Sequence, residues 1–220
     1  MPKQKITKEM VVNAAFDLAR NGGMEQVIVK NIAEKLGCSV QPIYSYCRSM
    51  DSLRADVMEQ AHRFVKDYLA EHTTPENLFQ TTGHAFVRLA KDEPDIFKLF
   101  IMRPRNNVSS LEELYQSEAD ERNAEAIASQ FGIDISKAKE LHLNMLIYTV
   151  GIGTIFSVTS PGIPPEEIFS RQEAAFRAFL QDVLSVESIR THKNAQDSMS
   201  FETALTKKED PHGAKNSHPI

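Results

Sequence analysis

The sequence predicts an all-α protein of about nine helices, and two observations support this. Apolar residues recur every three or four positions through most of the 220 residues, as they do on the buried face of a helix. Capping residues, glycine and proline mark the breaks between these segments, and no segment shows the alternating pattern of a strand or the signal of a β-hairpin. We therefore expect helices joined by loops.

Three short helices and one long helix are predicted in the first third of the chain. Gly22-Gly23 ends the first helix, and Gly37 supplies the turn after the second. Ser39 is a suitable N-cap for the third helix and Ser49 for the fourth. The predicted helices cover about residues 7–21, 31–36, 40–46 and 50–72.

Five further helices are predicted in the rest of the chain. Pro75 and Pro94 stand where a first helical turn tolerates proline, Ser110 begins a capping box, and Ser136 is a candidate N-cap. The predicted helices cover about residues 74–90, 96–102, 111–131, 136–158 and 166–186. From Glu187 onward the chain is polar with no strong apolar period, so we expect a disordered tail.

Composition favours a cytoplasmic globular protein. Apolar residues make up 41% and charged residues 25%, which is normal for a packed domain. The longest nearly uncharged apolar stretch, residues 145–158, is shorter than the roughly 20 residues that a membrane-spanning helix needs, and the N-terminus lacks the apolar core of a signal peptide. Cys38 and Cys47 have neither zinc-ligand spacing nor the number for a disulfide framework, so we expect reduced thiols.

Charge is distributed unevenly along the chain. Residues 1–55 hold eight basic and five acidic side chains, a net charge of +3, and the remainder carries −8 of the total of −5. A basic N-terminal module on an acidic body suits contact with phosphates at one end, although an excess of three charges is also compatible with chance.

The segment 28–52 carries the strongest functional pattern, that of a helix-turn-helix. Gly37 permits the tight turn, Ala33 is small enough for two helices to cross closely, and Val40 and Ile43 are expected to anchor the second helix to the first. The other face of that helix is then free to enter a DNA groove. There the Gln41 amide has the donor and acceptor to pair with an adenine edge.

Residues 6–57 resemble the TetR (tetracycline-repressor-like) family of bacterial transcriptional regulators. Order and spacing both agree with the family pattern. The resemblance rests on Ile6, Ala14-Ala15-Phe16, Gly22 or Gly23, the run Val29 to Ser39, Ile43-Tyr44-Ser45-Tyr46, and Ser49-Met50-Asp51-Ser52-Leu53. It covers a quarter of the chain and implies an N-terminal three-helix DNA-binding domain followed by a larger helical domain for effector binding and dimerisation.

Three positions depart from the family pattern. Ile28 replaces the usual Thr or Ser cap, Cys47 the usual Phe, and Met50 the usual Lys. The missing lysine removes one phosphate contact, which Arg48 lies close enough to replace. The predicted domains are residues 1–50 for DNA binding, 51–187 for effector binding and dimerisation, and 188–220 for the polar tail.

The resemblance and the residue chemistry together give three sets of candidate site residues. For DNA they are Lys5, Thr7, Lys30, Ser39, Val40, Gln41, Pro42, Tyr44, Ser45, Tyr46 and Arg48. For a small apolar or aromatic effector they are Phe64, His84, Phe86, Phe97, Phe100, Met102, His142, Met145 and Tyr148. For the dimer interface they are Ile152, Ile155, Phe156, Phe169, Phe176, Phe179, Leu180 and Val183.

The function predicted is that of a homodimeric DNA-binding regulator, a repressor released from a palindromic operator by its effector. Two alternatives stay open: a helical ligand-binding or protein-interaction module with a weakened helix-turn-helix, and a regulator that activates. An enzyme is disfavoured because no nucleophile elbow, phosphate loop or HExxH spacing occurs. No cofactor and no metal are expected.

Overall fold

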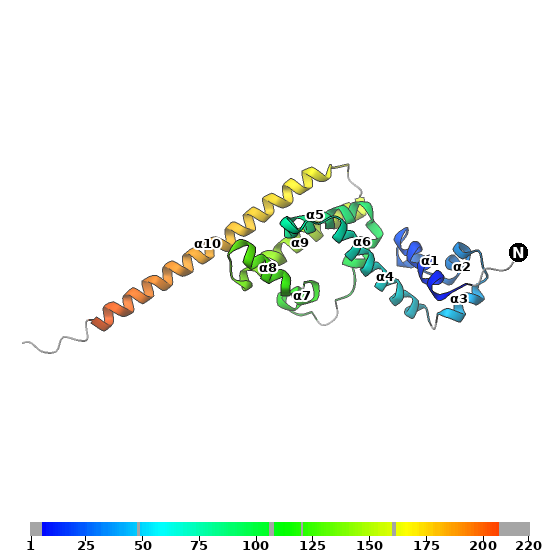
Figure 1. Ribbon diagram of the computed structural model, residues 1–220, viewed down its shortest axis with the longest axis horizontal. Helices are drawn as coiled ribbons and strands as arrows, with labels where there is room; N and C mark the ends of the chain where they lie inside the picture. Colours follow the sequence, from blue (N-terminus) through cyan, green and yellow to red (C-terminus); the bar gives the residue numbers. More distant parts are fainter. Residues whose placement is uncertain (1–5, 48, 106–107, 120, 160–161, 207–220) are drawn as a thin grey trace, which may run out of the picture. The chain divides into compact units, whose positions relative to one another are not determined.

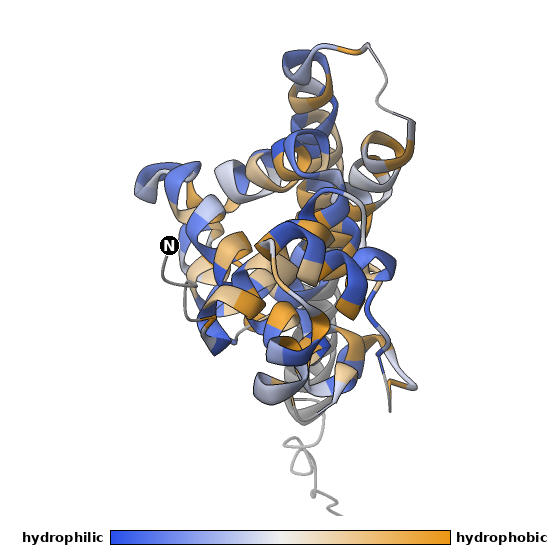
Figure 2. Ribbon diagram, turned by 90° about the vertical axis from the view of Figure 1, so that its right-hand side faces the viewer, coloured by the Kyte–Doolittle hydropathy of each residue, from blue (hydrophilic) through white to orange (hydrophobic). Residues whose placement is uncertain are grey.

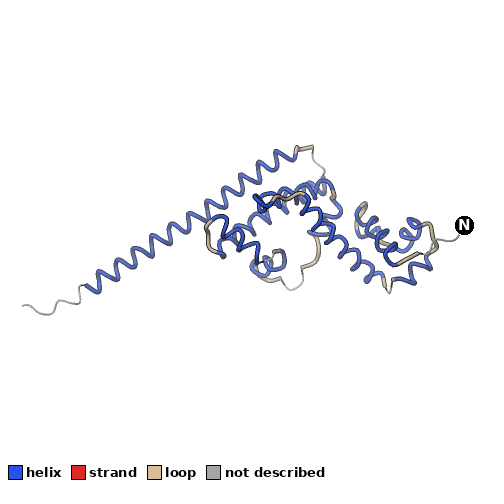
Figure 3. The backbone as a smooth tube through the Cα atoms, in the orientation of Figure 1, coloured by secondary structure: helices blue, strands red, loops and turns tan. Residues whose placement is uncertain are grey.

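The computed structural model describes residues 6–47, 49–105, 108–119, 121–159 and 162–206, and for residues 186–206 the backbone alone. The described chain consists of helices and loops (Figures 1 and 3), so the predicted all-α class is confirmed. The described elements are α1 (Lys8–Arg20), η1 (Met24–Gln26), α2 (Val29–Leu36), α3 (Val40–Tyr46), α4 (Met50–Glu71), η2 (Pro75–Asn77), α5 (Leu78–Asp92), α6 (Pro94–Ile101), α7 (Leu111–Glu118), α8 (Glu121–Phe131), α9 (Ile135–Thr159) and α10 (Pro165–Thr206).

The chain divides into two compact units, residues Met1–Phe176 and Arg177–Ile220. The first contains α1 to α9 and the beginning of α10, and the second contains the remainder of α10. The predicted boundary at residue 50 coincides with the start of α4, but α1 packs on α4 across it and keeps both sides in one unit.

The three N-terminal helices bury apolar residues in a core that is continuous with that of α4, α5, α6 and α9. Val11, Ala15 and Phe16 of α1 are buried, and Ile32 of α2 and Ile43 of α3 are fully buried with them. Each helix carries both hydrophobic and hydrophilic residues (Figure 2), as expected of amphipathic helices that share one core. α1 packs against α2, α3, α4 and α6, so this module is joined to the body through α4 and α6.

α9 is the central helix of the body. It packs against α5, α6 and α8, and Leu141, Met145 and Phe156 are buried along it. By length and composition alone this helix could also cross a membrane, contrary to the sequence-based expectation that none could. In the fold 39% of its most apolar window is buried, and one such helix among the described residues is weak evidence for a membrane span.

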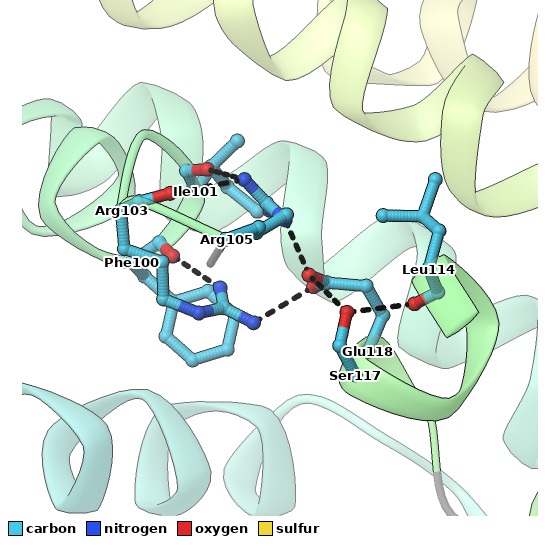
Figure 4. A network of polar contacts seen from close by, with 7 residues as sticks. All are labelled: Phe100, Ile101, Arg103, Arg105, Leu114, Ser117 and Glu118. Atoms are coloured by element: carbon cyan, nitrogen blue, oxygen red, sulfur yellow. Dashed lines mark hydrogen bonds and ion pairs between the residues drawn. The ribbon is translucent and has the colours of Figure 1, made fainter. Parts of the chain in front are cut away.

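The helix predicted over residues 111–131 is two helices, α7 and α8. α7 ends at Glu118, and the following Ala119 has an extended backbone. The Glu118 carboxylate accepts hydrogen bonds from Arg103, at 2.9 Å, and from Arg105, at 2.5 Å (Figure 4). These bonds satisfy a carboxylate whose side chain is only 5% exposed, at the end of α7. Hydrophobic periodicity gives no sign of such a contact.

Among the other differences, α9 begins at another cap than predicted and α10 ends much later. Asp134, rather than Ser136, caps α9, because its carboxylate accepts hydrogen bonds from the backbone N–H groups of Ser136 and Lys137. α10 extends to Thr206 instead of ending near Val186, since no glycine or proline interrupts residues 187–206 and polarity alone does not stop a helix. Residues 207–220 of the predicted tail lie outside the described residues.

Candidate nucleic-acid interface

The turn between α2 and α3 has the geometry predicted from Gly37. This residue has φ of 62° and ψ of 32°, a left-handed conformation that glycine adopts without penalty from a side chain. The N–H groups of Gly37 and Cys38 donate to the carbonyls of Glu34 and Ala33 at the end of α2. Ile43 of α3 and Ile32 and Ala33 of α2 are buried, which fixes the two helices against each other.

One face of α3 is exposed, and it carries the side chains predicted to read DNA. Gln41, Tyr44 and Ser45 are exposed, with Tyr44 at 61% of its maximal surface. Val40, expected to point inward with Ile43, is 44% exposed. The correction follows from helix geometry: Val40 precedes Tyr44 by four residues and shares its face, so it belongs to the exposed surface.

The other residues predicted to contact DNA differ in their exposure and in their hydrogen bonds. Lys30 is exposed at the start of α2, and Ser39 is exposed with no capping hydrogen bond from its side chain. Thr7 is exposed, but its hydroxyl accepts from the N–H of Met10 as the N-cap of α1. Pro42 and Tyr46 are half-buried on α3. Lys5 and Arg48 lie outside the described residues.

Most basic side chains described in the N-terminal 55 residues are already paired with carboxylates. Lys8 lies 3.0 Å from Asp56, and Lys35 lies 3.3 Å from Asp17. Arg54 pairs with Asp51, and Arg20 pairs with Glu93. The positive charge of this region is therefore largely neutralised where it is described, and Lys30 is the cation there with no carboxylate within ion-pair distance.

Cys47 directly follows α3 and is half-buried. Burial raises the pKa of its thiol above the ordinary value, and the nearby Asp56 carboxylate adds to the effect. A raised pKa disfavours the reactive thiolate. Cys47 therefore packs against the core with the properties of an ordinary thiol.

The residues predicted to bind an effector lie in several separate places. Phe64 contacts Phe16 of α1, at the junction of the N-terminal module and the body. Phe86, Phe100 and His62 form a ring cluster among α5, α6 and α4. His84 stacks on Phe169, Phe97 and Met145 are buried, Tyr148 is half-buried, and Met102 is exposed beyond the end of α6.

His142 belongs to a different cluster, made of α5, α7 and α9. Its Nδ1 lies 3.0 Å from the Tyr115 hydroxyl, and its ring meets the edge of Phe79 with centroids 5.5 Å apart. Burial lowers the pKa of His142 to about 4. The imidazole is therefore neutral at pH 7 and accepts or donates one hydrogen bond within an aromatic surrounding.

Sequence reasoning missed a buried polar contact beside this cluster. Gln172 of α10 donates to the carbonyl of Gly83, at 3.2 Å, and to the hydroxyl of Thr149, at 3.1 Å. Gln172 and Thr149 are both buried. Ser170, Arg171 and Glu173 beside it are also polar, so the sequence carried no signal that singled out Gln172.

The predicted dimer residues do not all face outward. Phe156 and Phe176 are buried within the first unit, where Phe176 contacts Phe79 and Phe131, so neither is available to a second chain. Ile155 is 57% exposed, while Ile152 and Phe169 are half-buried. Phe179, Leu180 and Val183 lie in the second unit.

An exposed apolar row runs along α9 beside these residues. Ile147, Ile155 and Val158 are exposed, and Gly151 between them has open space where a side chain would be. Their spacing of four, four and three residues places them on one face of the helix. We call Ile147, Gly151, Ile155 and Val158 the α9 row.

Comparison with known proteins points to transcriptional regulators. No profile of a known protein family matches the chain. It is 20% identical over 105 residues to the uncharacterized HTH-type transcriptional regulator YobS of Bacillus subtilis, an alignment that covers 46% of this chain and 55% of that protein. A crystal structure of a transcriptional regulator from Rhodococcus has a TM-score of 0.52 at 16% identity, covering 80% of this chain and 97% of the other. The chain thus shares the fold of a transcriptional regulator.

Proposed function

We propose that this protein is a DNA-binding transcriptional regulator of the TetR type. The observation that carries the proposal is the exposed face of α3, where Gln41, Tyr44 and Ser45 stand on a helix that Ile43 and the Gly37 turn fix to α2. A helix held in this way can enter the major groove and present its amide to a base edge. The likeness to two transcriptional regulators supports the same reading.

The proposed active form is a homodimer acting on a palindromic operator in the cytoplasm. The α9 row supports this, because an exposed apolar face on a central helix is stabilised by burial against a second copy. Two subunits would place two copies of α3 on one DNA face. The proposal includes neither an enzymatic activity nor a cofactor.

The proposed regulation is release of the operator when a small, largely apolar effector binds the helical body. A hundredfold loss of DNA affinity requires the effector to prefer the non-binding conformation by about 2.7 kcal/mol, which is within the normal range of allosteric coupling. Repression is the simplest outcome for a protein that occupies an operator until a ligand arrives.

Selection of bound fragments from the host genome, followed by gel shift of the enriched sequence, tests the proposal. We expect enrichment of a two-fold symmetric site and a shift that Gln41→Ala weakens. A folded protein that enriches no sequence would contradict DNA regulation and favour the ligand-binding or protein-interaction alternative. If transcription rises when the protein occupies its site, the protein is an activator and the proposal of repression is wrong.

A further inference from the structure

One buried polar atom in the body lacks a hydrogen-bond partner. Among the buried side-chain nitrogen and oxygen atoms of the described residues, Gln172 Oε1 has none, although Gln172 is only 2% exposed. The orientation of this amide is determined by its other end. The carbonyl of Gly83 can only accept a hydrogen bond, so Gln172 Nε2 must face it and Oε1 is directed elsewhere.

The Thr149 hydroxyl next to it has the complementary group, a hydrogen-bond donor. It accepts a hydrogen bond from Gln172 Nε2 and donates to no other described residue. The pair therefore offers one free acceptor, Gln172 Oε1, and one free donor, the Thr149 O–H. A hydroxyl group matches both, since it donates through its hydrogen and accepts through its oxygen.

Aromatic rings lie one helical turn from this pair on both α10 and α5. Phe176 lies one turn after Gln172 on α10, and Phe79 lies one turn before Gly83 on α5, with the two ring centroids 5.6 Å apart. His142 meets the edge of Phe79. An aromatic ring would exchange water for contacts with these rings without losing the hydration of a charge.

We propose that Gln172 and Thr149 anchor the hydroxyl group of a small neutral aromatic molecule, which is the effector. Calling this molecule the effector rests on the proposed function. The binding of its hydroxyl group does not depend on whether the protein binds DNA. A buried acceptor without a partner destabilises the empty protein, so a ligand that supplies the donor gains more than its apolar contacts alone provide. Sites built around such groups discriminate strongly against analogues that lack the hydroxyl.

Two pairs of probes test the proposal on the full-length chain by titration calorimetry. Phenol and 2-naphthol carry the hydroxyl, while toluene and 2-methylnaphthalene carry a methyl group of similar size in its place. We expect at least one hydroxyl probe to bind with a dissociation constant at least tenfold lower than that of its methyl partner. The preference should disappear in Gln172→Leu and in Thr149→Val.

Gln181→Leu is the matched control, because Gln181 is an exposed glutamine on the same helix. It should retain the full hydroxyl preference. Thr149→Val keeps the shape of the side chain and removes only the hydroxyl, so it decides the question if Gln172→Leu does not fold.

Three results would overturn the inference. They are the absence of binding by both hydroxyl probes, equal affinity for hydroxyl and methyl partners, and a hydroxyl preference that survives in Thr149→Val. Each would assign the Gln172 acceptor to water rather than to a ligand. Gel shift with the selected fragment tests the proposed function separately. If the protein binds this DNA but none of the probes, only the inference about the ligand site is overturned. If it binds a probe but no DNA, only the proposed function as a DNA-binding regulator is overturned.

Discussion

The guanidinium of Arg20 and the carboxylate of Glu93 form an ion pair with two hydrogen bonds between α1 and the start of α6. Arg20 Nε donates to Glu93 Oε2 at 2.7 Å, and a second nitrogen donates to Oε1. The same guanidinium lies over the ring of Phe64 on α4, 4.8 Å from its centroid. One side chain therefore joins the N-terminal module to two helices of the body.

We expect this pair to contribute a measurable coupling energy. Its bidentate geometry and the low exposure of Glu93 favour a stronger interaction than an ordinary surface pair provides. A double-mutant cycle with Arg20→Gln and Glu93→Gln should give a coupling of about 1 kcal/mol in the free energy of unfolding, measured by urea denaturation. Both single variants should also alter operator affinity, because they loosen the attachment of α1 to α6.

The exposed pair Arg54–Asp51 is the control for this cycle. Its closest nitrogen and oxygen atoms lie 3.7 Å apart, and the Asp51 side chain is almost fully exposed. The corresponding cycle should give a coupling near zero, as is usual for surface pairs. Equal couplings for the two pairs would show that the Arg20–Glu93 contact has no special structural role.

The N-terminal module was the most predictable part of the molecule. Its helix ends are set by local chemistry that a sequence displays, as at Gly37, whose left-handed turn agrees with the prediction. α3 begins and ends as predicted, at Val40 and Tyr46. The predicted orientation of Val40 was wrong, because the sequence of a short helix does not determine which face each residue lies on. The packing of the helix determines it.

The body was less predictable because long-range contacts determine its details. The break after Glu118 depends on Arg103 and Arg105, which lie more than ten residues away and have no fixed sequence relation to it. Phe176 belongs to an apolar stripe on α10, and periodicity could not tell whether that stripe faces its own subunit or a second one. Gln172 and Thr149 meet across 23 residues, so neither stood out before the helices were packed.

Substitutions on α3 should separate sequence reading from general DNA affinity. Gln41→Ala is expected to reduce the preference for the cognate duplex over a scrambled one, because its amide would contact a base edge. Tyr44→Phe and Lys30→Gln should weaken binding to both duplexes alike, with Lys30→Gln also lowering the salt dependence by about one unit per site. Fluorescence anisotropy at several salt concentrations measures both effects. An equal loss on both duplexes for Gln41→Ala would show that it does not read a base.

Two glycines of α9 should respond oppositely to the same substitution. A Cβ atom at Gly153 would approach Phe97 Cε2 to 2.8 Å and another atom of that ring more closely still, whereas a Cβ at Gly151 would meet nothing within 4 Å. Gly153→Ala should therefore lower the free energy of unfolding by about 1–3 kcal/mol through overpacking. Gly151→Ala should raise it by up to about 1 kcal/mol, because alanine is the better helix former. Thermal unfolding at matched protein concentration distinguishes them, and a neutral Gly153→Ala would mean that α6 can shift away from α9.

Stability should fall as the pH drops from about 6.5 to about 4, partly because of His142. Its pKa is about 4 in the folded protein and 6.5 in an ordinary environment, so the unfolded chain binds a proton first and is favoured in this window. The contribution is on the order of 3 kcal/mol at its largest. His142→Phe should flatten this part of the profile. Parallel profiles for the wild type and His142→Phe would assign the dependence to other groups.

The last prediction concerns the surface through which two copies would associate. Ile155 is exposed in the middle of the α9 row, so Ile155→Asp leaves the single chain intact and places a carboxylate in water. In a dimer joined through this row the same carboxylate would be buried without a partner, at a cost of several kcal/mol. We therefore expect Ile155→Asp to sediment as a folded monomer with greatly reduced operator affinity, since one helix-turn-helix reaches only one half-site.

Phe176→Asp provides the contrast for that experiment. Phe176 is 7% exposed and packs against Phe79 and Phe131 within its own subunit, so a carboxylate there should unfold the chain rather than dissociate it. Analytical ultracentrifugation together with circular dichroism separates the two outcomes. A folded Ile155→Asp that remains dimeric would exclude the α9 row as the interface, and a folded, monomeric Phe176→Asp would show that Phe176 belongs to the interface instead of the core.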